Sequence, residues 1–170
     1  MMEQTGEKKV PLLEMQGFRV LFPGRKGPMA AVDGVDLSIY PGEIVGVVGE
    51  SGSGKSVMSQ SILRLREYET SLRYEGSIRF EGQDLLQLPL SALRQIRGNR
   101  ISVIFQDPLT SLSPVHTVGK QMGEVLRLHK KLSRKEALER SGELLHLVGI
   151  PDPARCLRQY PYELSGGMQQ

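Results

Sequence analysis

Apolar and polar positions alternate over residues 13–22 and again over residues 35–39. This period of two predicts strands with one face in a core, and the turn-forming residues at 23–28 and 41–42 predict that the strands pair in a small antiparallel sheet. A polar connector, residues 66–76, leads to a short alternating stretch at 77–80 that we expect to extend the sheet. The apolar positions of these strands are Leu13, Met15, Phe18, Val20, Phe22, Val35, Leu37, Ile39, Ile78 and Phe80.

Two other stretches are apolar without alternation, IVGVV at 44–48 and ISVIF at 101–105. Such runs are typical of strands buried on both faces of a parallel sheet, and we expect these two to lie side by side. After the first run, a glycine-rich turn is followed by Met58, Ile62 and Leu65 at helical spacing. The order strand, turn, helix predicts an α/β fold.

The later part of the chain has helical periodicity, over residues 118–129 and 133–148. Ser133 followed by Glu136 forms a capping box, which predicts a helix start, and Gly149 before Pro151 predicts its end. We also expect a short basic helix that Ser91 caps and Gly98 ends. The sequence therefore predicts a small helical subdomain inserted into the α/β core.

The composition excludes several classes of protein. With 170 residues, 39% hydrophobic and 24% charged, the chain is neither disordered nor fibrous. The net charge of +3 comes from scattered basic residues, so we expect no nucleic-acid partner. A single cysteine, Cys156, allows no intrachain disulfide, and the histidines have no metal-ligand spacing. Because no apolar stretch has signal-peptide or bilayer length, we expect any membrane association to go through a partner.

The strongest chemical signal is the stretch GESGSGKS at 49–56, where Gly49, Gly54, Lys55 and Ser56 match GxxxxGK[ST]. Glycines let the backbone curl around a polyphosphate with its N–H groups pointing inward. Lys55 adds a cation for the β and γ phosphates, Ser56 an oxygen ligand for Mg²⁺, and the following helix its positive N-terminal end. A phosphate-binding loop is therefore predicted here.

Other candidate residues carry weaker signals. Phe22, close to this loop, fits either a core position, which its residue type alone favours, or a ring that stacks on a base. Gln106 ends the second apolar run, where ligands collect in parallel sheets. The next residue, Asp107, is not predicted to be an acidic Mg²⁺ ligand, because Gln106 interrupts the run and Pro108 forces a turn. Ser165, ahead of two glycines, is a good N-cap for a second phosphate-binding helix start.

In combination, GESGSGKS, VIFQDP at 103–108 and LSGGMQ at 164–169 resemble the Walker A, Q-loop and signature motifs of ABC transporter ATPases. The segments FQDPLTSLSP and YPYELSGGM further resemble the oligopeptide, dipeptide and nickel importer subfamily. The resemblance covers nearly the whole chain from about residue 12, and its motifs occur in the family's order. Tyr162 differs from it, because the family usually has His there.

This resemblance implies a set of ligands and partners. ATP and Mg²⁺ would be bound, with Phe22 stacking on adenine and with Ser56 and Gln106 at the metal. The signature residues would bind the γ-phosphate of an ATP held by a second ATP-binding subunit, in a homo- or heterodimer. The loop after Gln106 would receive membrane-spanning permease subunits, so the protein would lie at the cytoplasmic face of the membrane. The implied nucleotide-binding residues are Phe22, Gly49, Glu50, Ser51, Gly52, Ser53, Gly54, Lys55, Ser56, Val57, Gln106, Ser165, Gly166 and Gly167.

The resemblance also implies a division of the chain and a missing part. We expect a flexible tail at 1–11, an ATP-binding P-loop core with its antiparallel subdomain at 12–108, a helical subdomain at 109–158 and a truncated signature segment at 159–170. The family continues into a Walker B strand with a catalytic Glu, and this sequence has no Asp-Glu dipeptide. No catalytic residue is therefore assigned, and whether the chain is an ATPase by itself stays open.

Three functions remain in view. The favoured one is part of the ATP-binding subunit of an ABC importer for peptides or a similar small solute. The alternatives are an ABC-type ATPase that acts on nucleic acid or ribosomes, and an inactive truncated gene product. The sequence after Gln106, which resembles that of importers, favours the ABC importer subunit.

Overall fold

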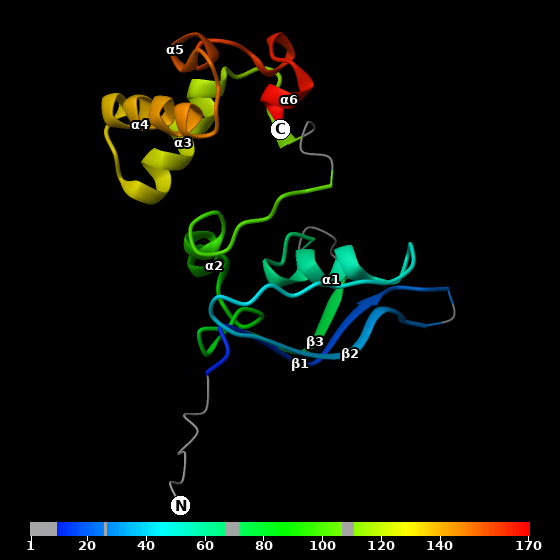
Figure 1. Ribbon diagram of the computed structural model, residues 1–170. Helices are drawn as coiled ribbons and strands as arrows, with labels where there is room; N and C mark the ends of the chain where they lie inside the picture. The colour runs from blue at the N-terminus through cyan, green and yellow to red at the C-terminus, as the bar shows by residue number, and fades with distance from the viewer. Residues whose placement is uncertain (1–9, 26, 67–71, 107–110) are drawn as a thin grey trace, which may run out of the picture. The chain divides into compact units, whose positions relative to one another are not determined.

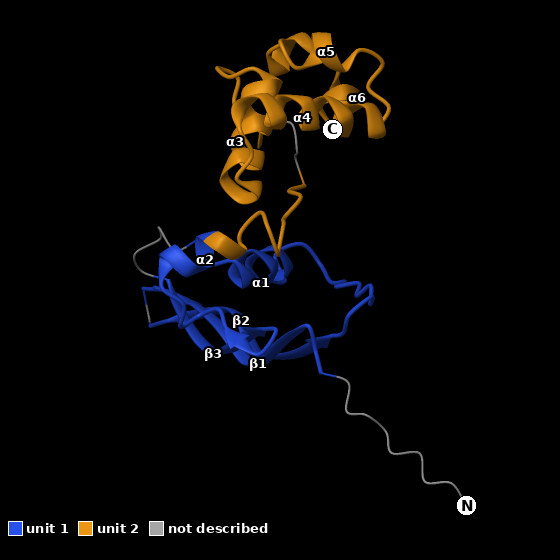
Figure 2. Cartoon of the chain, turned by 90° about the vertical axis from the view of Figure 1, so that its left-hand side faces the viewer, with its two compact units in different colours: residues 1–94 blue, residues 95–170 orange. Residues whose placement is uncertain are grey.

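The computed structural model describes residues 10–25, 27–66, 72–106 and 111–170, which divide into two compact units, residues 1–94 and 95–170 (Figure 2). Each unit has its own hydrophobic core. Most of the predicted tail, residues 1–9, and also Asp107 and Pro108 lie outside the described residues. The domain boundaries predicted from the sequence stay predictions.

The first unit is built on a four-stranded antiparallel sheet with the order β2-β1-β3-β4 (Figure 1). Its strands are β1 (Leu13–Phe22), β2 (Met29–Ile39), β3 (Arg73–Phe80) and β4 (Gln83–Asp84). The predicted N-terminal antiparallel sheet is confirmed. However, β2 and β3 begin earlier than the alternation indicated, and β3 includes residues 73–76 of the predicted connector.

The core of this sheet depends on a bulge in its central strand. Met15 pairs with Leu37 on one side and Ile78 on the other, and the register then shifts before Phe18. Gly17 allows the shift because its φ of 52° lies in the left-handed region, and its N–H donates to Asp36 Oδ1 at 2.6 Å. As a result Met15 and Phe18, three residues apart, are both buried on the same core.

The described residues of the first unit also form the helices α1 (Lys55–Ile62) and α2 (Leu90–Ile96), and α2 continues past the unit boundary. Both views place α1 over one face of the sheet (Figures 1 and 2). The predicted role of Ser91 as N-cap is wrong, because the first turn forms at Pro89, whose carbonyl accepts from the N–H of Ala92 at 3.0 Å.

The second unit is helical, with α3 (Val118–Lys130), α4 (Arg134–Leu147), α5 (Pro153–Cys156), the 3₁₀ turn η2 (Pro161–Glu163) and α6 (Gly166–Gln169). The predicted capping box at the start of α4 is confirmed, since Ser133 Oγ accepts from the N–H of Glu136 and the Glu136 carboxylate accepts from the N–H of Ser133. The core of this unit is formed by Val118, Leu145, Ile150, Cys156, Leu157 and Leu164.

The two continuous apolar runs differ from the prediction. Residues 44–48 form no strand in the described part of the chain, and Ile44 and Val48 are 98% and 92% exposed. In the second run only Ile101 makes a ladder contact, an isolated parallel bridge with Arg97, and Ile104 is 90% exposed. The physical reason is that a strand needs a hydrogen-bonded neighbour, and no described residue supplies one to residues 44–48 or 102–105.

Candidate functional site

The loop at residues 49–56 closes around the ammonium group of Lys55. Lys55 Nζ donates to the backbone carbonyls of Gly49 at 2.8 Å and Glu50 at 2.7 Å, and to Ser53 Oγ at 3.2 Å. A backbone hydrogen bond from Ser53 to Glu50 at 3.2 Å closes the turn between them. The loop thus holds a cation at its centre, and an anion could take the place of the oxygen atoms that now accept hydrogen bonds from it.

Two glycines of this loop lie where a side chain would collide with other atoms. A Cβ on Gly54 would lie 2.1 Å from the carbonyl oxygen of Ala31 in β2, and the residue has a left-handed φ of 88°. A Cβ on Gly49 would lie 2.8 Å from Ser53 Oγ. Gly52 is also left-handed, at 84°, but open space surrounds its Cβ position. The loop therefore approaches β2 at Gly54 as only glycine can.

The helix that follows presents its N-terminus beside Lys55. Gly54 is the N-cap of α1 and provides no side-chain cap, so the N–H groups of the first turn keep their capacity to bind an anion. Ser56, in this turn, is exposed. This arrangement fits a polyphosphate with a bound Mg²⁺, because it combines a tight loop, a central cation and an uncapped helix start with a hydroxyl group. The predicted residues 49–57 thus come together in one loop and one helix start.

Phe22 lies at the end of β1 and is half-buried rather than part of the core. Its register partner is Met29, which stands two residues along β2 from Ala31, the residue that Gly54 touches. Two residues of strand span about 7 Å. The distance between the Phe22 ring and the loop is therefore short enough for one nucleotide to reach both. The Arg66 guanidinium lies over the ring, 5.4 Å from its centroid.

The remaining predicted residues belong to the second unit. Gln106 follows the run at 101–105, and Ser165 is the N-cap of α6, with its Oγ accepting from the N–H of Met168 at 3.4 Å. Gln169 holds this segment together, because its side-chain amide donates to the carbonyls of Pro161 at 2.6 Å and Leu164 at 3.3 Å. The N-cap role predicted for Ser165 is confirmed, whereas its role toward nucleotide stays a prediction.

In the part of the chain that the structure describes, the other reactive groups form no second site. Burial raises the pKa of the Cys156 thiol, and the nearby Asp152 carboxylate raises it further. Cys156 is accordingly a core residue of the helical unit. Among the described residues, no group of His, Cys, Asp or Glu is placed to hold a metal ion, and no helix is long and apolar enough to cross a bilayer.

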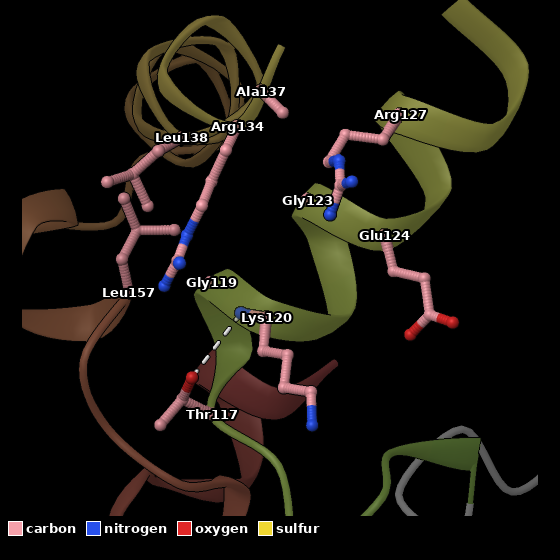
Figure 3. Close-up of a pocket in the computed structure, with 10 residues that line it drawn as sticks. All are labelled: Thr117, Gly119, Lys120, Gly123, Glu124, Arg127, Arg134, Ala137, Leu138 and Leu157. Atoms are coloured by element: carbon pink, nitrogen blue, oxygen red, sulfur yellow. Dashed lines mark hydrogen bonds between the residues drawn. The ribbon is translucent and has the colours of Figure 1, made fainter. Parts of the chain in front are cut away.

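A basic groove lies between α3 and α4 (Figure 3). It has a volume of about 660 Å³ and an apolar side formed by Ala137, Leu138 and Leu157. Its cationic residues form no ion pair with any described residue. The groove residues are Thr117, Gly119, Lys120, Gly123, Glu124, Arg127, Arg134, Ala137, Leu138 and Leu157.

Comparison with known proteins decides the family, because the family described as ABC transporter matches residues 32–170. The chain belongs to the ABC transporter family. Among its curated relatives in this family, "Probable peptide ABC transporter ATP-binding protein y4tR" of Sinorhizobium fredii is 48% identical over 98% of this chain and 50% of its own length. "Peptidoglycan transport ATP-binding protein YejF" of Agrobacterium fabrum is 49% identical over 94% of this chain and 29% of its own length.

A solved ABC transporter structure confirms the fold class. The ATP-binding cassette MJ0796, a dimer in a post-hydrolysis state bound to ADP and phosphate, has a TM-score of 0.76 and is 26% identical. The match covers 92% of this chain and 65% of that one. The predicted resemblance to the family is therefore confirmed. The chain spans about half the length of the first curated relative, and less of the other.

Sequence reasoning missed two features of this ABC transporter chain. Arg66 lay within a predicted connector, and no spacing rule links a connector residue to the end of a distant strand. The basic groove had a detectable signal, because Lys120 and Arg127 are seven residues apart and so share one face of a helix.

Proposed function

We propose that this chain is the nucleotide-binding part of an ABC importer ATP-binding subunit for peptides or a similar small solute. The observation that carries the proposal is the loop closed on Lys55, at the start of an uncapped helix. In binding ATP, Lys55 would exchange the carbonyls of Gly49 and Glu50 for phosphate oxygens. The loop N–H groups and the α1 N-terminus would neutralise the remaining charge.

In this proposal the resemblance to the family assigns two residues to the metal, Ser56 of the loop and Gln106 of the second unit. The Ser56 hydroxyl would bind Mg²⁺, and the Gln106 side chain would contact the metal and the attacking water. When bound, Mg²⁺ would neutralise charge that develops on the phosphate oxygens. Phe22 would stack on adenine, which its half-buried position near the loop supports.

Titration with Mg-ATP tests the nucleotide-binding proposal. Lys55→Ala removes the central cation, and the loss of a hydrogen-bonded charge of this kind weakens binding about tenfold or more. Lys120→Ala, in the other unit, is the matched control and should leave the ATP affinity unchanged. Equal affinities of wild type and Lys55→Ala would contradict the proposal.

Dimerisation and membrane attachment are part of the same proposal. Ser165, Gly166 and Gly167 would bind the γ-phosphate of an ATP held by a second ATP-binding subunit, and the dimeric state of the MJ0796 cassette supports this. Permease subunits would hold the protein at the cytoplasmic face of the membrane. The relatives are named for peptide and peptidoglycan transport, which favours an importer over a nucleic-acid or ribosome partner.

The basic groove is the proposed contact with a permease segment, because its cations and apolar side suit an amphipathic segment with acidic residues. Lys120→Glu with Arg127→Glu should reduce co-purification with co-expressed permease subunits. Arg158→Glu, an exposed charge of the same unit outside the groove, is the matched control. Undiminished co-purification of the double variant would contradict this contact.

A further inference from the structure

The Arg66–Phe22 contact joins two segments that are distant in the sequence. Phe22 ends β1, and Arg66 lies beyond the end of α1, which stops at Ile62. The guanidinium carbon is 5.4 Å from the ring centroid, within the range of a cation–π interaction. Such a contact fixes one face of an aromatic ring and leaves the other face for a second planar partner.

The end of β1 that carries Phe22 lies close to the loop at residues 49–56. Leu21, next to Phe22, pairs with Ala30 of β2 on one side and with Arg73, the first residue of β3, on the other. The phosphate loop touches the β2 side, because Gly54 packs against Ala31. The Arg66 guanidinium already covers one face of the Phe22 ring. A base attached to a triphosphate in the loop would therefore stack on the other face of the ring.

From this geometry we infer that Arg66 is a positioning residue of the nucleotide-base site. Its guanidinium contacts one face of the Phe22 ring, and a purine would stack on the opposite face. The inference rests on the proposed ATP binding and adds a residue to that site. Arg66 acts through Phe22, because it holds the ring in an orientation suited to stacking and polarises the ring from the face opposite to the base. The stacked order is base, Phe22, Arg66.

The test separates recognition of the base from recognition of the phosphates. Affinities for Mg-ATP and for inorganic triphosphate are measured on wild type and Arg66→Ala. A cation–π contact at a half-exposed site corresponds to about two- to fivefold in affinity, so Arg66→Ala should weaken ATP binding by that factor and leave triphosphate binding unchanged. Arg66→Lys, which keeps a cation, should restore part of the loss.

Two further variants control this test. Arg73→Ala removes a nearby exposed arginine, paired with Glu75 at 3.3 Å, and should not change ATP affinity. In a Phe22→Leu background, Arg66→Ala should have no further effect, because the ring through which it acts is gone. Tighter ATP binding by Arg66→Ala, an equal loss for both ligands, or no loss would overturn the inference. Absence of any effect of Lys55→Ala would instead overturn the proposed function.

Discussion

Gly54→Ala tests whether the phosphate loop depends on its close approach to β2. Two terms contribute to the expected effect. The added Cβ would lie 2.1 Å from the Ala31 carbonyl oxygen, whereas ordinary contacts begin at 3.4 Å, so loop or strand must move by about 1.3 Å. Overpacking of this kind costs about 1–3 kcal/mol. The left-handed conformation costs alanine about 1–2 kcal/mol more, partly offset by the reduced entropy of the unfolded chain, about 0.4–1 kcal/mol.

Gly52→Ala is the matched control, because it carries the left-handed strain without the collision. We expect Gly52→Ala to lower the free energy of unfolding by about 1 kcal/mol or less, since strain and entropy nearly cancel. Gly54→Ala should lower it by about 2–4 kcal/mol. Thermal unfolding followed by circular dichroism measures the difference, and Mg-ATP titration should show a larger affinity loss for Gly54→Ala. Equal effects of the two variants would refute the reasoning.

Two further predictions concern the helical unit. Ser133→Ala should lower the free energy of unfolding by about 1 kcal/mol, measured by urea denaturation. The hydrogen bonds from the Ser133 side chain and backbone hold the pKa of Glu136 below its usual value, so their stabilisation is present above the unfolded-state pKa, roughly 4.3, and is lost as the pH falls through the lower folded value. The variant should therefore lose less helix signal in acid than wild type, and an identical acid titration would contradict this. Cys156, buried and with a raised pKa, should react slowly with maleimide until urea unfolds the unit; rapid labelling of the folded chain would count against the buried position.

The elements that could be predicted from the sequence are those fixed by local chemistry. The capping box at Ser133 and the glycine-rich loop before Lys55 depend on neighbouring residues, and both are found where the pattern indicated. The apolar runs at 44–48 and 101–105 show the limit of this reasoning. An apolar run indicates that a segment can be buried, but a strand also requires a hydrogen-bonded partner that the run does not encode.

Candidate site residues divide in the same way. The phosphate loop is continuous in the sequence, so its residues could be named together. Arg66 could not be named, because its contact with Phe22 joins segments that are distant in the sequence and follows from no spacing in the chain. The start of α2 shows a competition between two local signals, in which Pro89 opens the first turn ahead of Ser91.

The hydrogen bonds that Lys55 makes within its own loop set the free energy that a ligand must supply in order to bind there. The ammonium group already has two carbonyls and a hydroxyl as partners, so an incoming anion must replace all of these contacts. Each hydrogen bond to a charged group contributes about 1.5–3 kcal/mol, and a single phosphate has few oxygens with which to offset that loss. Under the proposed function, a chain of phosphates would reach the lysine, the loop amides and the helix start together. The loop would thereby select polyphosphates before any group recognises the base.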